Sequence, residues 1–380
     1  MRVALDAFLL LSSFTGIARY TRELAAQLMR SADIELHLQY GLGWSRELRE
    51  APVPSIGWLK AAFKSAVPAP YQVVRAARQI AFSAGVARKK IELYHAPAFL
   101  PLSFSGPTII TIHDLSFLRY PAAHPEERVR MLNRHLPRAI EESSFVLVDS
   151  DFVRGEVREA YGAPADKVVT THLGVSERFH PMSELHTRPV LERHGLRHGR
   201  YVLSVGTLEP RKNLVGTLEA YGMLPAAIRG SHPLAIVGML GWHMSEMKSR
   251  LAALSRAGDV MALGYVPEND LPDLYAGAAA FIYPSIYEGF GLPVLEALAS
   301  GVPVVTSNRS SLKEVAGDCA ATVDPEDYPG LSAALLEALR EHEGKQADRK
   351  RGIEWAKNFT WALCAEKTAS IYRRALKLAM

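Results

Sequence analysis

The sequence predicts an α/β protein built from two parallel sheets with helices on both faces. Three observations support this prediction. Short apolar runs rich in β-branched residues alternate along the chain with stretches of helical spacing, which is the rhythm of parallel strands joined by crossover helices. The 380 residues, 48% of them hydrophobic, are enough for two domains. A polar segment without strong periodicity, residues 179–200, separates two such series.

The apolar runs place the individual strands. In the first half they predict strands at residues 3–7, 34–40, 108–112, 145–148 and 168–171. In the second half they predict strands at residues 201–205, 234–237, 260–263, 280–283 and 302–306. Helical spacing predicts helices at residues 17–29, 213–224, 245–257, 293–300, 328–340 and 361–380. Because such sheets bind ligands beyond the carboxyl ends of their strands, the loops that follow strands are the places to search.

Composition narrows the function classes. The net charge of +4 is small for this length and does not indicate nucleic-acid binding. The two cysteines, Cys319 and Cys364, form no CxxC pair and imply no disulfide framework. Asp6 interrupts the apolar start of the chain, so that start is interpreted as a buried strand and not as a signal peptide. A cytoplasmic protein is expected.

The most informative segment is Glu288-Gly-Phe-Gly-Leu-Pro-Val-Leu-Glu296. Pro293 suits the first position of a helix, where its missing N–H costs nothing. Glu288 would then lie on the loop before the helix and Glu296 near the end of its first turn. Since the N-terminus of a helix binds anions, this stretch offers a phosphate cradle and two acceptors for sugar hydroxyls.

A second loop places two adjacent cations after a strand. In Thr207-Leu-Glu-Pro-Arg-Lys-Asn213, Arg211 and Lys212 could neutralise a diphosphate, the first by forked hydrogen bonds and the second as a point charge. The alternative interpretation is a solvated loop in which Asn213 caps the next helix.

The first half carries weaker candidates. Gly16 follows the first strand and permits close approach of a ligand, although a plain turn explains it equally. His113 ends another strand and is either a site residue or a satisfied buried histidine; for His95 the structural interpretation is favoured. Asp149-Ser-Asp151 matches a D-x-D metal pattern, but Asp149 ending a strand and Asp151 capping a helix is the simpler interpretation. No metal site is predicted.

Residues 51–91 contain no Asp or Glu. Basic and aromatic side chains are interleaved there, and residues 58–67 show helical spacing. A basic amphipathic surface of this kind fits anionic lipid heads, whereas the alternative is a solvated helix face. The basic residues Lys60, Lys64, Arg75 and Arg78 are the candidates for contact with a membrane.

Taken together, the motifs resemble the retaining nucleotide-sugar glycosyltransferases of family GT4, which have the GT-B fold. The likeness covers nearly the whole chain and rests on an ordered set of motifs. These are the E-x7-E pair, the Pro-Arg-Lys-Asn loop, the glycine loop at Gly16, the pair His113-Asp114, the Gly264-Tyr-Val-Pro segment with Leu271 and Tyr275, and Tyr283-Pro-Ser285. The phrasing Thr-Gly-Ile-Ala-Arg-Tyr and Ile-His-Asp-Leu-Ser-Phe looks most like bacterial mannosyltransferases of O-antigen and other polysaccharides.

The resemblance implies a domain organisation. Residues 1–185 would form an acceptor-binding Rossmann-like domain and residues 186–360 a Rossmann-like domain that binds the nucleotide-sugar. The two doubly wound sheets would face a central cleft, and a C-terminal helix, residues 361–380, would return to the first domain.

The resemblance also implies roles for individual residues. Glu296 would bind ribose hydroxyls, Arg211 and Lys212 would stabilise the departing diphosphate, and His113 would contact the sugar. Catalysis is assigned to Glu288, His113, Arg211 and Lys212. Donor binding is assigned to Gly16, Gly206, Thr207, Arg211, Lys212, Tyr265, Val266, Tyr283, Ser285, Glu288, Gly289, Phe290, Gly291, Leu292 and Glu296. Contact with the acceptor or the membrane is assigned to Asp114, Lys60, Lys64, Arg75 and Arg78.

The implied reaction is retaining transfer of a hexose, with mannose from GDP-mannose as the first choice. The acceptor would be a glycan or a polyprenyl-diphosphate-linked saccharide at the inner face of the plasma membrane, with neither cofactor nor metal. GDP-rhamnose or a UDP-sugar is the alternative donor. A GT-B epimerase and a silent sugar-binding scaffold are alternatives of other classes; a phosphorylase would need a lysine for a pyridoxal group, for which no pattern exists. Front-face attack is favoured over a covalent intermediate on Glu288.

Overall fold

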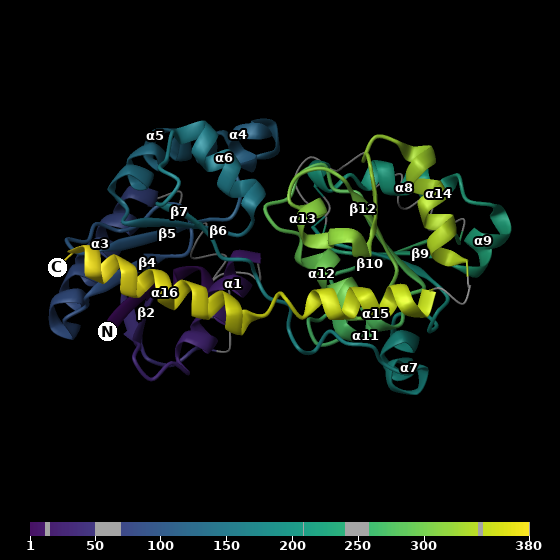
Figure 1. Ribbon diagram of the computed structural model, residues 1–380, viewed down its shortest axis with the longest axis horizontal. Helices are drawn as coiled ribbons and strands as arrows, with labels where there is room; N and C mark the ends of the chain where they lie inside the picture. Colours follow the sequence, from purple (N-terminus) through teal and green to yellow (C-terminus); the bar gives the residue numbers. More distant parts are fainter. Residues whose placement is uncertain (12–15, 50–69, 208, 240–257, 341–344, 380) are drawn as a thin grey trace. The chain divides into compact units, whose positions relative to one another are not determined.

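The computed structural model describes residues 1–11, 16–49, 70–207, 209–239, 258–340 and 345–379. The chain divides into two compact units, each with its own sheet (Figure 1). The first unit comprises Met1–Leu118, Glu126–Leu173 and Trp361–Met380. The second comprises Arg119–Pro125 and Gly174–Thr360.

The first unit contains a seven-stranded sheet in the order β3-β2-β1-β4-β5-β6-β7. All neighbouring strands are parallel except β3, which pairs with β2 in the antiparallel direction. The strands are β1 (Arg2–Asp6), β2 (Glu35–Tyr40), β3 (Gly43–Ser45), β4 (Leu93–Ala96), β5 (Thr108–Ile112), β6 (Phe145–Val148) and β7 (Val168–Thr170). The central strands are nearly continuous runs of buried apolar residues because helices cover both faces.

Helices complete the first unit. They are α1 (Gly16–Leu28), α3 (Pro70–Lys89), α4 (Ser116–Arg119), α5 (Glu126–Glu142), α6 (Asp151–Tyr161) and α16 (Trp361–Ala379). Helix α16 forms because apolar and small side chains recur at helical spacing, and it packs that buried stripe against α1, as the yellow ribbon of Figure 1 shows. The C-terminal helix therefore belongs to the first unit.

A buried hydrogen-bond chain fixes α16 to the sheet. His95 on β4 contacts the Tyr372 hydroxyl through Nδ1 (2.7 Å) and the Thr111 hydroxyl through Nε2 (2.8 Å). Burial lowers the pKa of His95 to about 3, so the ring is neutral. His95 is thus a satisfied structural histidine, as predicted.

The second unit contains a six-stranded parallel sheet in the order β10-β9-β8-β11-β12-β13. Its strands are β8 (Val202–Val205), β9 (Leu234–Val237), β10 (Val260–Gly264), β11 (Ala280–Tyr283), β12 (Val304–Ser307) and β13 (Ala321–Val323). Its helices are α7 (Glu184–Arg193), α8 (Leu214–Gly222), α9 (Ala226–Ser231), α11 (Leu271–Ala276), α12 (Leu292–Ala299), α13 (Leu312–Ala316), α14 (Tyr328–Leu339) and α15 (Lys345–Ala356). The strand order reverses between β8 and β11, and the loops at this switch point form the natural ligand site of such a sheet.

The predicted α/β class with two doubly wound sheets is confirmed, and each predicted strand has a counterpart. The predicted helix at residues 245–257 lies outside the described residues. The segment predicted as a polar linker differs, because Ser183 caps helix α7 within it. The predicted boundary between residues 185 and 186 falls inside that helix, which packs against α11 of the second unit.

Among the described helices, none combines the length and the apolar character that crossing a bilayer requires.

Candidate active site

Glu288 is the centre of a buried charge cluster at the switch point of the second sheet. Its Oε1 accepts hydrogen bonds from Lys212 Nζ (2.5 Å), the Tyr283 hydroxyl (2.7 Å) and the Ser285 hydroxyl (2.7 Å). Its Oε2 lies 3.4 Å from Arg211 Nη1. Both Arg211 and Lys212 follow β8, whereas Tyr283, Ser285 and Glu288 end or follow β11. The two strands that flank the switch point thus bring the predicted residues together.

The cluster holds its carboxylate and both cations in charged form. Burial by itself would raise the pKa of Glu288, but the charges of Lys212 and Arg211 and their hydrogen bonds lower that pKa to about 2. Burial lowers the pKa of Lys212, and the Glu288 carboxylate opposes this shift. Arg211 also pairs with Glu209, whose Oε1 lies 2.8 Å from Nη2. The two cations are therefore held in place by two carboxylates.

A rigid turn positions the cations. Pro210–Lys212 form a 3-10 turn, and the Arg211 carbonyl accepts the Ile286 backbone N–H (2.8 Å). Asn213 follows in the left-handed conformation (φ 53°) and caps α8 by accepting the Gly216 N–H (3.0 Å). The side chain of Asn213 also donates to the carbonyls of Pro284 and Pro325. The capping role predicted for Asn213 is confirmed, and this residue additionally ties the cationic turn to the β11 loop.

The glycine loop between Glu288 and α12 is held by two serines. Ser310 accepts the Glu288 N–H (3.0 Å), and the Ser311 hydroxyl lies within hydrogen-bond distance of the carbonyls of Glu288 and Phe290. Gly291 precedes α12 with φ 118°, a conformation that favours glycine. The helix begins at Leu292, one residue before Pro293, and Glu296 is buried in it. The predicted loop is present, the helix starts one residue earlier than predicted, and the serines were not predicted.

The other predicted donor-binding residues of the second unit lie at strand ends. Gly206 and Gly238 follow β8 and β9, and a Cβ on Gly238 would lie 1.9 Å from the Gly206 carbonyl oxygen, so this approach requires glycine. Thr207 is exposed beside Gly206. After β10, Tyr265 is 60% exposed and Val266 is buried. These positions suit a ligand that covers the carboxyl edge of the sheet; Gly289, Phe290 and Leu292 belong to the glycine loop.

The predicted residues of the first unit have internal roles. His113 contacts Asp149 Oδ2 through Nδ1 (2.7 Å) and the Pro97 carbonyl through Nε2 (2.8 Å). Burial alone would lower the pKa of His113, but Asp149 and these hydrogen bonds raise it above its ordinary value. Contact of His113 with the sugar stays a prediction, since both ring nitrogens face acceptors within this unit.

Three further residues named in the sequence analysis belong to the first unit. Asp114 accepts from the backbone and hydroxyl of Ser116 at the start of α4. Gly16 opens α1, and a Cβ there would meet no atom within 4 Å. The predicted helix cap at Asp151 is wrong: Ser150 is the N-cap of α6 and accepts the Val153 N–H.

Two of the basic residues assigned to a membrane surface point inward. Arg78 pairs with Asp6 at 2.7 Å and has a side chain only 14% exposed. Arg75 donates to the Pro101 carbonyl (2.7 Å). Both guanidinium groups bind polar groups at the ends of strands and loops of the first unit, and contact of these residues with the acceptor or a membrane stays a prediction. Lys60 and Lys64 lie outside the described residues.

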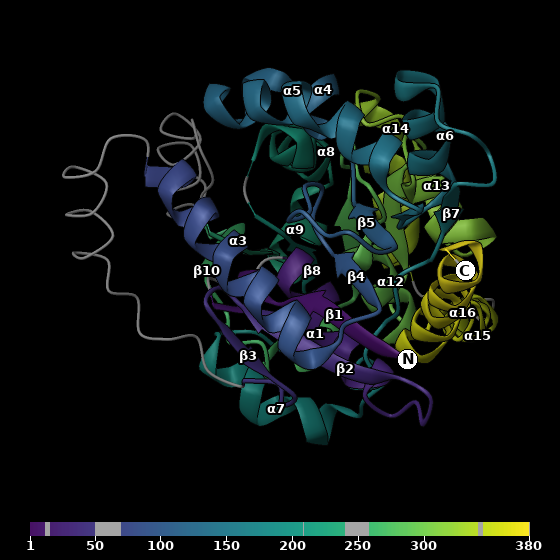
Figure 2. The ribbon, with the colours of Figure 1, turned by 90° about the vertical axis from the view of Figure 1, so that its left-hand side faces the viewer.

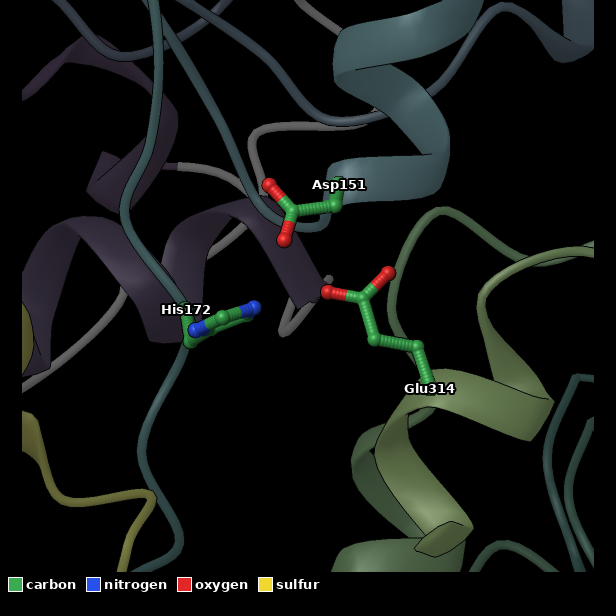
Figure 3. A group of neighbouring side chains, drawn as sticks. All are labelled: Asp151, His172 and Glu314. Carbon is green, nitrogen blue, oxygen red and sulfur yellow. The ribbon is translucent and has the colours of Figure 1, made fainter.

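Three described side chains that could ligate a metal belong to different units, so no metal site is inferred from them. Figure 3 shows Asp151 at the start of α6, His172 beyond β7 and Glu314 on α13. Asp151 and His172 belong to the first unit, and Asp151 already accepts the Thr170 hydroxyl (2.6 Å). Two possible ligands from a single unit are too few to define a metal centre.

The depressed pKa of Glu288 makes the stability of the second unit depend on pH. A carboxylate with pKa about 2 when folded and 4.5 in its ordinary state stabilises the fold fully above pH 4.5, and this contribution is lost as the pH falls toward 2. We expect it to amount to about 3 kcal/mol at neutral pH. In Glu288→Gln the difference from the wild type should therefore be large at pH 6 and shrink steadily below pH 4.5. Urea unfolding at several pH values measures it, and a pH-independent difference would contradict the assigned charge state.

The chain matches two glycosyltransferase families, one in each half. "Glycosyltransferase Family 4" matches residues 14–179, and "Glycosyl transferases group 1" matches residues 192–358. The O-antigen chain mannosyltransferase B of Escherichia coli is 36% identical over 366 residues, which is 94% of this chain and 96% of that protein.

Solved structures agree on the fold. Sucrose-phosphate synthase from Thermosynechococcus elongatus superposes with a TM-score of 0.75 at 18% identity and covers 99% of both chains. HepE from Anabaena, in complex with UDP-glucose, superposes with a TM-score of 0.73 at 16% identity and covers 98% of this chain and all of that chain (100%). The sequence relationship along the whole length and these shared folds show that the chain belongs to glycosyltransferase family 4 and is a glycosyltransferase with the GT-B fold.

Proposed function

We propose that this glycosyltransferase moves mannose from GDP-mannose to a growing O-antigen or related cell-surface glycan. The relationship to a protein named O-antigen chain mannosyltransferase B along nearly its whole length supports this choice. The observation that carries the proposal is the buried cluster of Glu288, Lys212 and Arg211 at the switch point, because it supplies preorganised charge beside a helix N-terminus.

The residues in and around the cluster contact different parts of the donor. Arg211 and Lys212 stabilise the diphosphate as its negative charge grows in the transition state. The glycine loop before α12 receives phosphate and sugar hydroxyls, and Glu296 accepts from the ribose. Because positively charged side chains supply the neutralisation, the reaction proceeds without a metal. We expect full activity after treatment with a chelator.

The surroundings of Glu288 favour front-face attack over a covalent intermediate. Lys212, Tyr283 and Ser285 donate to Oε1 and Arg211 lies 3.4 Å from Oε2, so these donors stabilise the negative charge that a nucleophile would have to share with the sugar. Its pKa of about 2 also marks a strongly stabilised and weakly nucleophilic group. In the front-face route a phosphate oxygen of the departing diphosphate accepts the proton of the acceptor hydroxyl, and Glu288 holds the sugar and orients Lys212.

The donor is tested by the thermal stability of the purified protein with GDP, UDP, dTDP and their sugar conjugates. A ligand at a hundred times its Kd adds about 2.7 kcal/mol of stability. Selective stabilisation by GDP and GDP-mannose is the expected result. Selective stabilisation by UDP would indicate a UDP-sugar as the donor. The HepE complex with UDP-glucose makes this outcome worth testing. A response to none of them would favour a silent scaffold, and turnover of donor without acceptor would favour an epimerase.

We further propose that the first unit contacts the anionic inner membrane through residues 51–91. This stretch has no acidic residue. Helix α3 lies within it (Figure 2), and its side chains Val73 (48%), Val74 (38%) and Ile80 (73%) are exposed. An exposed apolar helix face beside basic residues is the pattern of an interfacial helix.

Vesicle binding tests the membrane proposal. Each basic residue near an anionic surface contributes about 1 kcal/mol, so Lys60→Ser/Lys64→Ser should lower the partition coefficient on phosphatidylglycerol vesicles about 30-fold. Ile80→Ser should weaken binding to these vesicles as well. Leu185→Ser, at a position on α7 that is 77% exposed, is the matched control. Equal partitioning of all four proteins would refute membrane contact through this stretch.

A further inference from the structure

A pocket of about 440 Å³ lies beside the charge cluster in the second unit. Two segments that both belong to this unit form its walls: the segment after α4 and the cationic turn after β8. Its lining residues are Arg119, Tyr120, Pro121, Ala122, Ala123, Glu209, Pro210, Arg211 and Ile286. This volume is within the range of small-molecule sites.

The walls are locally rigid. Pro121–Ala123 form a 3-10 turn closed by the Ala123 N–H to the Tyr120 carbonyl (2.9 Å) and the His124 N–H to the Pro121 carbonyl (3.0 Å). The Tyr120 ring lies 5.5 Å from the ring of the buried Tyr287. The opposite wall is the turn that begins at Pro210. Both walls are therefore formed before a ligand arrives, which lowers the entropic cost of binding.

The chemistry of the lining suits a polyhydroxylated ring. Glu209 and Arg211 pair at 2.8 Å with side chains 18% and 16% exposed, and together they present carboxylate acceptors and guanidinium donors to neighbouring hydroxyls. Arg119 is a further charged lining residue, and the rest of the surface is apolar, with the Tyr120 ring, two prolines and Ile286. A purely apolar ligand would desolvate the ion pair without replacing its water, which is costly. A sugar ring offers both hydroxyls and an apolar face.

We propose that this pocket is the subsite for the terminal sugar of the acceptor glycan, with Tyr120 as its apolar platform and Glu209 as the hydroxyl-binding group. The inference rests on the proposed function. Arg211 connects the pocket to the reaction centre, because Nη2 pairs with Glu209 and Nη1 reaches Glu288. A sugar bound here lies next to the residue that stabilises the departing diphosphate, as front-face attack requires.

Substitution of Tyr120 tests the subsite. Tyr120→Ala should raise the KM for the probe acceptor, octyl α-mannoside, about ten-fold through loss of the aromatic platform. The KM for GDP-mannose and the rate of donor hydrolysis should be unchanged. Tyr120→Phe keeps the ring and should behave like the wild type, and Leu185→Ala controls for loss of an exposed apolar side chain. An unchanged KM for the probe acceptor, or an equal rise in the KM for GDP-mannose, would overturn the proposal.

Direct binding separates this inference from the donor assignment. Saturation-transfer NMR with octyl α-mannoside, without any nucleotide, should show binding to the wild type and Tyr120→Phe and a strong loss for Tyr120→Ala. If the wild type does not turn over GDP-mannose but this pattern appears, the donor assignment fails and the subsite stands. If turnover occurs and binding of the probe is independent of Tyr120, the subsite fails and the proposed function stands.

Discussion

Lys212→Met is expected to lower both the stability of the second unit and the activity of the enzyme. The substitution removes the cation that lies closest to Glu288. The buried carboxylate then keeps Arg211, at 3.4 Å, as its remaining cationic partner in the cluster. Breaking a buried ion pair from one side costs about 3–5 kcal/mol. Loss of a preorganised donor toward the diphosphate should also lower kcat/KM by about 10²–10³. Chemical denaturation and initial rates measure the two effects.

A charge-balanced double variant separates stability from catalysis. Lys212→Met/Glu288→Gln removes both members of the pair, so most of the lost stability should return because no uncompensated charge stays buried. Its activity should stay as low as that of the single variant. The account of the cluster would be contradicted if Lys212→Met kept a normal unfolding free energy, or if the double variant regained activity.

Arg211→Ala is expected to reduce kcat more than it raises the KM for the donor. In the proposed reaction Arg211 acts on charge that develops as the glycosidic bond breaks, so its removal should affect the transition state more than the bound donor. We expect kcat/KM to fall about 100-fold or more, on the order of 3 kcal/mol. Arg211→Lys should recover little, since an ammonium group cannot bridge Glu209, Glu288 and the diphosphate as a guanidinium fork does.

Arg193→Ala is the matched control for Arg211→Ala. Arg193 lies on α7 of the same unit, is 59% exposed and pairs with Asp270 on the surface. An exposed pair contributes little, so kcat/KM should stay near the wild-type value. If Arg211→Ala kept an activity near that of Arg193→Ala, Arg211 would not be needed to stabilise the diphosphate. Lys212 and the α12 N-terminus would then be the groups that stabilise it.

Strong local patterns predicted most of the fold. Apolar runs located ten strands, including the edge strands β7 and β10, because most parallel strands of such sheets are buried on both faces and form apolar runs. The sequence analysis missed β3, β4 and β13. Strand β4 contains Tyr94 and His95, and the polarity of His95 is compensated only by Thr111 and Tyr372, which are distant in sequence. Strands β3 and β13 are three-residue edge strands with few buried residues.

Those site residues that lie together in a short segment were predictable from the sequence. The Glu288–Glu296 stretch and the Arg211-Lys212 pair each carry a local signal, and the switch-point rule brings them together. The partner of Arg78 and the Tyr120 wall of the pocket beside Arg211 carry no such signal. Asp6 is 72 positions from Arg78, and Tyr120 reaches the second unit from a loop between two helices of the first. Only the folded chain shows which basic side chains are neutralised and which surfaces they line.

The most direct test of the central claim is the product formed from GDP-mannose labelled with ¹³C at C1 and a mannose-terminated acceptor, followed by NMR. The account predicts acceptor-dependent release of GDP and a new mannosidic linkage with the anomeric configuration of the donor. It also predicts that Lys212→Met and Arg211→Ala form this product slowly. Inverted configuration would contradict the front-face mechanism. Transfer only from a UDP-sugar, or GDP release without a new linkage, would contradict the assignment as a GDP-mannose-dependent mannosyltransferase.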